Sequence, residues 1–502
     1  MSSLETTQQL LFDREVLPAI ADRERRSQLG QFFTPSVVAD FMASLFEPLP
    51  REIRLLDAGA GAGSLTEAFV QHCCRSPKPP DAISVAAFEV DEWALDQLQS
   101  TLQRCQRACR EAGIEFSPVI NEQDFIAAAS DATRNLFSPQ MQFDAAIVNP
   151  PYRKINSSSR ERRLLRGVGI ETSNLYSAFI ALIVRLLAPG GQLVAITPRS
   201  FCNGPYFRPF RTDFLSRMSL RRMHVFDSRS AAFASDAVLQ ENVVFHAVKG
   251  REPPANVVIS SSAGTPGSVI SARGVPFSEM VHPHDPERFI HLETDDAHRQ
   301  ARNLMCALPA SLASLGVMVS TGRVVDFRAR EHLRAEAEPG CVPLLYPCHF
   351  VQGVVSWPKS GSRKPNAILD TSATRDLLVP SGHYVLVKRF SAKEEKRRIV
   401  AAVCNPEQIP GAVWGIENHL NYFHVNGLGL DRELASGLSA FLNSTIVDQY
   451  FRQFSGHTQV NSTDLRSFRY PAAASLRRLG SLLSASLPSQ PELDELVLRE
   501  LF

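Results

Sequence analysis

The tetrapeptide Asn149-Pro150-Pro151-Tyr152 has the residue types and the spacing to do chemistry on a nitrogen atom. If the Asn149 side-chain oxygen and the Pro150 carbonyl both accept hydrogen bonds from an NH2 group, they favour a pyramidal nitrogen whose lone pair can point at a methyl donor. Tyr152 would offer an aromatic face on which a planar base can stack. The motif therefore predicts methyl transfer to a planar nitrogen. The alternative is that the prolines end a buried strand and the tyrosine packs in the core.

A sheet must position this motif. The apolar run 143–148 directly precedes it and predicts a strand that ends at Asn149. Open α/β sheets bind ligands at the carboxyl ends of their strands, so we expect the motif at that edge. Upstream, residues 57–63 form a glycine-rich turn between a strand-like run and a helical pattern, and such a turn lets a ligand approach the backbone closely. Its spacing differs from the dinucleotide fingerprint, so the turn alone does not identify the ligand.

Two further apolar runs each lead to an acidic residue. Glu89 follows the first run, and a carboxylate at a strand tip can accept both hydroxyls of a ribose. Asp91 is instead predicted to cap the helix that begins near Trp93. Asp124 follows the second run and could accept from an adenine amino group while Phe125 lies on the ring. The alternative for Asp124 is an ordinary loop aspartate.

The order of these motifs resembles that of the γ class of amino-group DNA adenine methyltransferases. Within that class the chain is similar to the TaqI methyltransferase-like family and to the stand-alone modification enzymes of type II restriction systems. The residues that carry the resemblance are Gly30 to Pro35, Asp57 to Gly63, Glu89, Asp124-Phe125 and Asn149 to Tyr152. The resemblance implies S-adenosylmethionine as cofactor and an adenine, flipped out of double-stranded DNA, as the methyl acceptor.

The resemblance also implies a role for each matched residue. In this family a Thr-Pro segment and the first glycine turn hold the methionine end of the cofactor, the acidic residue after the second strand binds the ribose, and an Asp-Phe pair binds the adenine. The matching residues here are Thr34 and Pro35, then Asp57, Ala58, Gly59 and Gly61, then Glu89, and finally Asp124 and Phe125. The family often has Glu-Pro where this chain has Asp57-Ala58, so the contacts of this loop are less defined than its location.

A second aromatic residue stacks on the target base in this family, on the side opposite the tyrosine. Phe233 precedes the strand-like run 242–248 and is the expected match. Phe226 is a close competitor, and either ring could instead belong to the core.

The remaining pattern predicts an α/β fold with two domains. Helical and strand-like runs alternate up to about residue 250, which is typical of a doubly wound sheet, with an antiparallel pair at 224–226 and 242–248. We therefore expect a Rossmann-like S-adenosylmethionine-dependent methyltransferase domain at 1–250 and a Pro-, Ser- and Gly-rich connector at 251–299 with some short strand content. Residues 300–502 would form an α+β target-recognition domain that reads the DNA sequence.

The charge balance directs attention to local clusters. The chain of 502 residues has a net charge of only +1, so contacts with DNA phosphates would depend on where the basic residues lie. Basic residues gather at 153–166, 208–222 and 388–398. Most individual members of such clusters are expected to be solvated or ion-paired.

The cysteines and the N-terminus indicate the compartment. The nine cysteines include no Cys-x-x-Cys pair and predict neither a zinc site nor a disulfide framework. The chain has no signal-peptide core and no long apolar span, so we expect a cytoplasmic protein without a membrane partner. We further expect a monomer whose partner is a separately encoded restriction endonuclease.

Two other functions remain open at this point. Protein-glutamine methyltransferases and some RNA methyltransferases also use Asn-Pro-Pro-Tyr, although their additional domain usually precedes the catalytic one. The chain could also be a non-catalytic DNA-specificity component of a defence complex. The intact residues Asp57, Glu89, Asp124 and Asn149 argue against a loss of catalysis.

Overall fold

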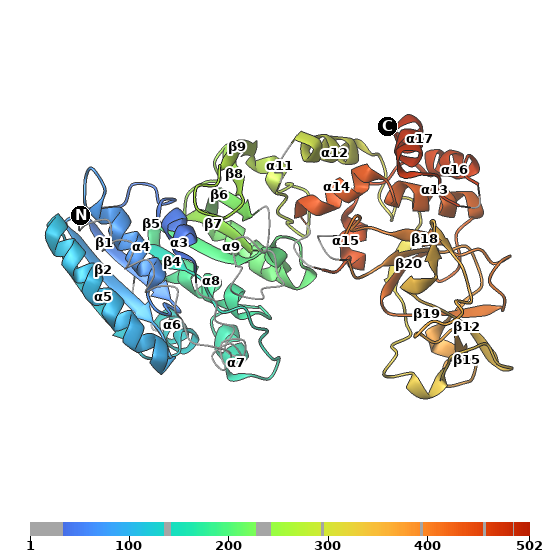
Figure 1. The fold of residues 1–502 in the computed structure, drawn as a ribbon, viewed down its shortest axis with the longest axis horizontal. Coiled ribbons are helices and arrows are strands. Elements are labelled where there is room, and N and C mark those ends of the chain that lie inside the picture. Colours follow the sequence, from blue (N-terminus) through green and yellow to red (C-terminus); the bar gives the residue numbers. More distant parts are fainter. Residues whose placement is uncertain are drawn as a thin grey trace, which may run out of the picture. The chain divides into compact units, whose positions relative to one another are not determined.

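The computed structural model describes residues 34–134, 142–226, 242–292, 296–391, 395–454, 458–484 and 486–502 (Figure 1). The chain forms two compact units, which are described separately below. The first comprises Tyr206–Glu279 and the described part of Met1–Phe201, and the second comprises Cys202–Pro205 and the described part of Met280–Phe502.

A nine-stranded sheet organises the first unit, in the order β3-β2-β1-β4-β5-β7-β6-β8-β9. Neighbours from β3 to β5 are parallel, whereas β7 pairs antiparallel with both β5 and β6. The strands are β1 Glu52–Ala58, β2 Ala82–Phe88, β3 Glu115–Asn121, β4 Phe143–Val148, β5 Leu187–Pro198, β6 Met218–Phe226, β7 Asn242–Lys249, β8 Asn256–Ser262 and β9 Ser271–Pro276. This order confirms the predicted doubly wound, Rossmann-like sheet and its antiparallel pair.

Helices cover both faces of this sheet. Leu55 and Ile147 belong to one apolar cluster with α3, α4 and α5, and the alternate residues Leu56 and Ala146 are also fully buried. The helices are α3 Ser36–Ala43, α4 Ser64–Cys74, α5 Glu92–Ala112, α6 Phe125–Arg134, α7 Arg160–Arg166, α8 Leu175–Leu186 and α9 Arg208–Arg217. The 3-10 turns η1 Arg199–Cys202 and η2 Pro205–Phe207 each span a division between the units. Asp91 accepts from the Trp93 amide at the start of α5, which confirms its predicted capping role.

The second unit combines two smaller sheets with helices, which confirms the α+β class. The six-stranded sheet has the order β10-β20-β17-β18-β14-β13, and the five-stranded sheet has the order β11-β15-β12-β19-β16. The strands are β10 Met318–Thr321, β11 Leu333–Arg334, β12 Cys341–Leu345, β13 Phe350–Val351, β14 Val354–Val355, β15 Ala367–Leu369, β16 Leu378–Pro380, β17 Val385–Lys388, β18 Ala401–Val403, β19 Val413–Ile416 and β20 Leu420–His424.

Helices of the second unit follow mostly at its C-terminal end. They are α11 Phe277–Met280, which spans the division between the units, α12 Asp296–Ala307, α13 Arg432–Leu442, α14 Thr445–Phe454, α15 Ser462–Ser467, α16 Ala473–Ser481 and α17 Gln490–Leu501, with 3-10 turns η3 Arg330–His332, η4 Pro347–His349 and η5 Arg375–Leu377. No helix in the described ranges is long and apolar enough to cross a bilayer.

The segment 251–299 is shared between the two units. Its strands β8 and β9 extend the sheet of the first unit, because β8 pairs with β6. From Met280 onward the chain belongs to the second unit. The expected connector therefore contains structured parts of both.

Two glycines allow α13 and α16 to cross at close range. A Cβ atom added to Gly437 would lie 1.8 Å from the Leu476 carbonyl oxygen, and one added to Gly480 would lie 1.9 Å from the Glu433 carbonyl oxygen. These contacts involve backbone atoms, which cannot move aside as a flexible side chain can. The two helices therefore require glycine at both positions.

This crossing predicts a stability effect. The substitution Gly480→Ala should lower the free energy of unfolding of the second unit by about 1–3 kcal/mol, because the helices must move apart. Urea unfolding followed by circular dichroism measures the change. The neighbouring exposed residue provides the control, and Ser481→Ala should stay within about 0.5 kcal/mol of the wild type. Equal stability of Gly480→Ala and the wild type would contradict the close crossing.

Candidate active site

A pocket opens in the first unit at the carboxyl ends of β1 to β4. Of the residues predicted to form the site, the following line it: Thr34, Gly59, Gly61, Glu89, Asp124, Phe125, Asn149 and Pro151. The other predicted residues lie next to or within two positions of these in the sequence but do not line the pocket; they are Pro35, Asp57, Ala58, Pro150 and Tyr152. Phe233 lies outside the described residues, whereas its competitor Phe226 is buried in the core cluster. The structure thus brings together residues from four separate strand ends.

Both ends of the Asn149 amide are held by hydroxyl groups. Asn149 Nδ2 donates to Thr34 Oγ1 at 3.1 Å, and Asn149 Oδ1 accepts from the Tyr152 hydroxyl at 2.7 Å. Thr34 precedes α3, whereas Asn149 follows β4, so the bond joins segments that are 115 residues apart in the chain. The amide is therefore held by contacts from two separate segments of the chain.

Tyr152 is placed by contacts on both its ring and its hydroxyl. The hydroxyl also lies 3.3 Å from the Ile196 carbonyl oxygen, and desolvation by burial raises the pKa of this hydroxyl above its usual value. The ring meets Tyr176 edge-on at 6.3 Å between centroids, and Tyr176 in turn stacks on Phe207. The phenol is therefore a neutral hydrogen-bond donor at physiological pH.

One carboxylate organises the glycine turn. Glu89 is 4% exposed, and its Oε2 accepts from the Gly61 amide at 2.7 Å. Its Oε1 accepts from the amides of Val90 and Asp91 at 2.8 and 2.9 Å. Gly61 has a φ of +55°, and a Cβ there would meet nothing within 4 Å, so the backbone borders open space in the pocket. Glu89 therefore connects the turn after β1 to the turn after β2.

Asp57 is buried beside this turn and is fully excluded from solvent. Its Oδ2 accepts from Thr66 Oγ1 at 2.6 Å, and among the described residues its Oδ1 has no hydrogen-bond partner. Burial raises the pKa of Asp57 to about 7, against the lowering effect of the Thr66 bond, and the nearby Glu89 raises it further. The turn thus contains a carboxyl group that gains a proton easily.

The Asp124-Phe125 pair begins α6. Asp124 is exposed, and its Oδ1 accepts from the Ala127 amide at 2.8 Å, so the carboxylate caps the helix and keeps its other oxygen available. Phe125 is 3% exposed and packs against Phe88 and Phe179 at 5.2 and 5.0 Å between ring centroids. The pair therefore presents a carboxylate beside an apolar wall.

Sequence reasoning missed several residues of this pocket. Phe179 and Leu175 on α8 and Glu161 on α7 line it. The helical pattern over α8 indicates burial but cannot say which buried residues face a cavity. Arg153, predicted as part of the basic cluster 153–166 and not of the pocket, also lines the pocket, and its carbonyl accepts from the Leu175 amide at 2.8 Å. Its position directly after the tetrapeptide was the available signal.

The described residues contain no cluster of three or more His, Cys, Asp or Glu side chains that could hold a metal ion. The polar groups of the pocket include carboxylates, amides, hydroxyl groups and the Arg153 guanidinium, and its walls are aromatic and aliphatic. Such a set fits an organic ligand that carries hydroxyl and amino donors together with an aromatic ring.

Comparison with known proteins identifies similar sequences over almost the whole chain. The type II methyltransferase M.PstI of Providencia stuartii is 45% identical over 485 residues, which is 96% of this chain and 95% of the relative. The type II methyltransferase M.BsuBI of Bacillus subtilis is 46% identical over 480 residues, which is 94% of this chain and 93% of the relative. The family model of the Eco57I restriction-modification methylases matches residues 85–233. Among solved structures, a DrdV–DNA complex is 12% identical, with a TM-score of 0.48, over 91% of this chain and 57% of that one.

The buried carboxyl group predicts a pH effect on stability. Asp57 has an ordinary pKa near 3.8 when unfolded and about 7 when folded. Between pH 4 and 7 the unfolded state therefore loses a proton that the folded state keeps, and the stabilising contribution of the protonated group is lost as the pH rises. The comparison protein is Asp57→Asn, which keeps an acceptor for Thr66. Relative to it, the free energy of unfolding of the wild type should fall by roughly 1–4 kcal/mol across this range and stay constant above it. Thermal unfolding at each pH measures this, and parallel curves for the two proteins would contradict it.

Proposed function

Because the chain belongs to the type II methyltransferases of restriction-modification systems, we propose that it transfers a methyl group from S-adenosylmethionine to the N6 amino group of an adenine in duplex DNA. The first unit would be the catalytic domain and the second would read the DNA sequence. A separately encoded restriction endonuclease would be its partner in the system, and the protein would act as a monomer.

The observation that supports this proposal is the pair of acceptors at the edge of the pocket. Asn149 lines the pocket and directly precedes Pro150 in a rigid Pro-Pro segment, so its Oδ1 and the Pro150 carbonyl oxygen would be the two acceptors. An amino group that donates to both oxygens is drawn out of conjugation with its ring, so its lone pair can attack. S-adenosylmethionine, when bound, supplies a methyl group on a positively charged sulfur. The target nitrogen, held by Asn149 and Pro150, would take up this methyl group and lose an amino proton to solvent, and the sulfur would keep the electron pair of the bond to the methyl carbon.

Thr34 and Tyr152 would orient this amide. Because the Thr34 hydroxyl engages Nδ2 and the Tyr152 hydroxyl engages Oδ1, the oxygen rather than the nitrogen would face the target amino group. The Tyr152 ring would also stack on the flipped base, with Phe233 as the proposed ring on its other side. Stacking on both sides would offset the few kcal/mol that extrusion of the base costs.

The cofactor would occupy the pocket between the strand ends. Glu89 would accept from the ribose hydroxyls, and Asp124 would accept from the adenine amino group beside Phe125. Gly59 and Gly61, which line the pocket, would lie along the methionine end of the cofactor, near Thr34 and Pro35. Asp57 and Ala58, the last two residues of β1, would hold this turn in position.

Removal of the Asn149 side chain tests the mechanism. Asn149→Ala should lower the single-turnover rate of methyl transfer to DNA at least about 1,000-fold, because this oxygen acts on the reacting nitrogen. The Kd for S-adenosylmethionine should change less than about threefold. The matched control is the exposed Asn156, and Asn156→Ala should retain the wild-type rate. Turnover by Asn149→Ala at a comparable rate would overturn the mechanism.

The ribose contact predicts a separate effect on cofactor affinity. Glu89→Ala should raise the Kd for S-adenosylmethionine at least about 10-fold, because it removes both the ribose acceptor and the bond that holds the Gly61 amide. Isothermal titration calorimetry measures this change. The exposed Glu92 on α5 provides the control, and Glu92→Ala should bind as the wild type does. An unchanged Kd for Glu89→Ala would show that the ribose lies elsewhere.

A further inference from the structure

An exposed histidine and an exposed phenylalanine lie side by side in the second unit. The His419 side chain is 46% exposed and Phe390 is 44% exposed, with 4.9 Å between their ring centroids. His419 belongs to the short connection between β19 and β20, whereas Phe390 follows β17. Two separate connections therefore present a polar ring and an apolar ring on one surface.

A buried carboxylate fixes the orientation of His419. Glu417 is fully buried, and its Oε1 pairs with His419 Nδ1 while its Oε2 accepts from the His419 amide at 2.9 Å. The Glu417 backbone is itself held, since its amide donates to the Leu345 carbonyl at 3.1 Å. Within the described part of the chain, His419 Nε2 has no hydrogen-bond partner. This nitrogen is therefore the one available to an incoming ligand.

Arg389 joins the two connections. Its amide donates to the His419 carbonyl at 2.9 Å, and its Nη1 donates to the Asn418 carbonyl at 2.6 Å. Its own carbonyl accepts from the Val460 amide at 2.8 Å. The backbone next to Phe390 is thus hydrogen-bonded directly to the backbone of His419.

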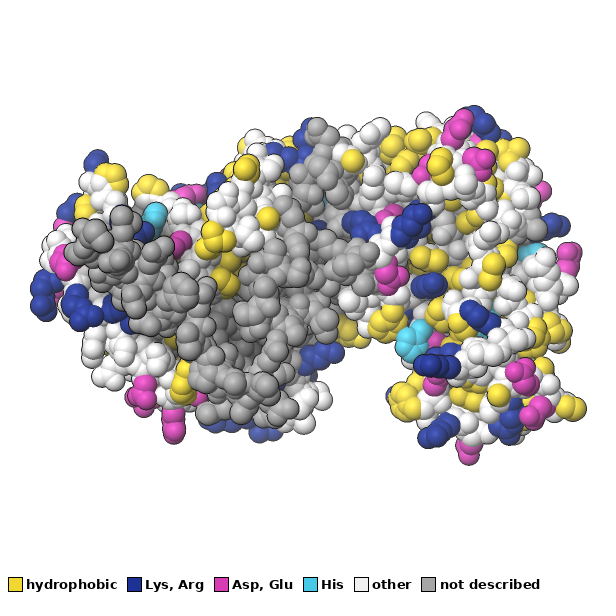
Figure 2. Space-filling model, in the orientation of Figure 1, with side chains coloured by type: hydrophobic (Ala, Val, Ile, Leu, Met, Phe, Trp, Pro, Cys, Tyr) yellow, Lys and Arg dark blue, Asp and Glu magenta, His cyan; other side chains and the backbone are white. Residues whose placement is uncertain are grey.

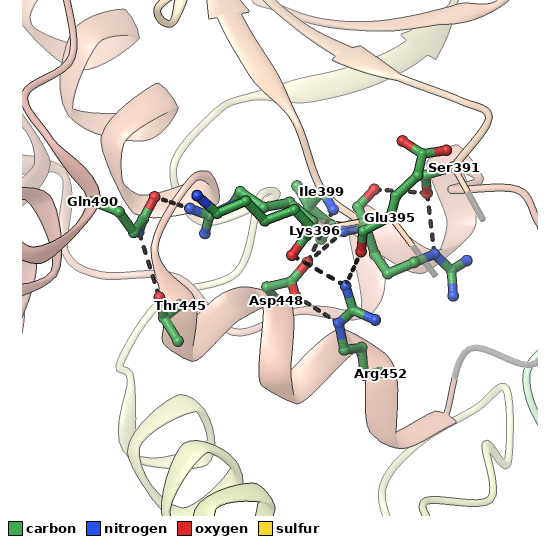
Figure 3. Close-up of polar contacts among 10 residues, drawn as sticks. Ser391, Glu395, Lys396, Ile399, Thr445, Asp448, Arg452 and Gln490 are labelled. Atoms are coloured by element: carbon green, nitrogen blue, oxygen red, sulfur yellow. Dashed lines mark hydrogen bonds and ion pairs between the residues drawn. The ribbon is translucent and has the colours of Figure 1, made fainter. Parts of the chain in front are cut away.

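The far end of the same loop is fixed to α14 (Figure 3). Asp448 Oδ1 accepts from the Arg398 amide at 2.6 Å and from the Ile399 amide at 3.3 Å. Arg452 donates to Asp448 Oδ2 at 2.7 Å and to the Glu395 carbonyl at 2.9 Å. Both ends of the connection between β17 and β18 are therefore anchored.

Two arginines of the basic cluster 388–398 serve this anchoring. Arg398 is 1% exposed and donates through Nε to Ser391 Oγ at 3.1 Å, so it links the two ends of the loop. Arg397 bonds to Gln490 on α17. By contrast, Lys396 is exposed. The expectation for such clusters was solvated or ion-paired side chains, whereas Arg398 is buried and hydrogen bonds join these two arginines to the neutral side chains of Ser391 and Gln490.

This arrangement places several charges out of water around one surface. Glu417, Asp448 and Arg398 are all buried. Burial of a charged group costs desolvation free energy, which its hydrogen bonds and partners must offset. Their presence here is explained if the orientation of the surface matters to function.

We propose that Phe390 and His419 form a preorganised base-reading surface that contacts the major-groove edge of one base pair in the DNA target. This inference rests on the proposed function, because it takes duplex DNA as the partner. His419 Nε2 makes one directed hydrogen bond to a base edge, and Phe390 packs beside it, as an apolar side chain does on a thymine methyl group. Phosphate contacts would come from exposed basic residues such as Lys396.

Base reading requires directional contacts and not only a general attraction to phosphates. Figure 2 shows Lys and Arg side chains scattered among acidic and apolar ones on the face in view. Phosphate contacts carry no sequence information, so sequence selection depends on directional contacts with the bases. A histidine fixed by a buried carboxylate is such a contact, because little rotational freedom is lost when it binds.

The test compares His419→Ala and Phe390→Ala with the wild-type full-length protein. The methylated site is first mapped on genomic DNA, and kcat/KM is then measured on that duplex and on duplexes with each base pair replaced in turn. For each variant, kcat/KM on the mapped site should fall about 10-fold, and discrimination should be lost at the same single base pair. The Kd for S-adenosylmethionine should not change. The control is His332→Ala, because His332 pairs with the exposed Glu331 at 3.4 Å, away from the buried network. It should behave as the wild type does.

The outcomes separate this inference from the proposed function. If kcat/KM of the variants falls equally on all duplexes, or does not fall, base reading by this surface is overturned. The proposed methylation of DNA is not affected by that result. If the wild type methylates no DNA, the proposed function fails. Fluorescence anisotropy with a duplex panel then tests the surface alone, and equal selectivity of the wild type and His419→Ala overturns it. Thermal unfolding of each variant identifies a loss that reflects misfolding, in which case His419→Gln replaces His419→Ala.

Discussion

The amide of Asn149 is the group on which the proposed chemistry depends, and two hydroxyl groups fix it. Thr34 holds its nitrogen at 3.1 Å and Tyr152 holds its oxygen at 2.7 Å. An amide that could turn over would present a donor to the target amino group in half of its orientations, and a donor there would repel it. The remainder of the first unit can be understood as a means of bringing these three residues together. Asn149 directly follows β4 at the edge of the sheet, and α3 begins two residues after Thr34.

A second constraint is the sharing of a single carboxylate between two turns. Glu89 accepts from the amides of Gly61, Val90 and Asp91, so the turns after β1 and β2 cannot move independently. The same carboxylate lines the pocket. The pocket is consequently preorganised before a ligand arrives, which lowers the entropic cost of binding. In the second unit the buried Glu417 fixes His419 in the same way.

The sequence allowed prediction of what depends on local pattern and chain order. Strand-like runs followed by Asp57, Glu89 and Asn149 place these residues at one sheet edge whatever the details of packing, and the Asp91 cap is a local bond. The other contacts arise from pairs that are distant in the chain. The spacing of residues in the sequence predicts neither the bond from Asn149 to Thr34 nor the contact between Phe179 and Phe125. The extension of the sheet by β8 and β9 through a Pro-rich segment is a similar tertiary effect.

The identity of the methylated atom tests the central claim most directly. Purified protein would be incubated with methyl-labelled S-adenosylmethionine and unmethylated genomic DNA, with total RNA and protein lysate in parallel, and the products digested and analysed by mass spectrometry. The account predicts labelled N6-methyladenine from DNA, confined on mapping to one short sequence. Label on cytosine N4, or label found in RNA or protein and not in DNA, would contradict it.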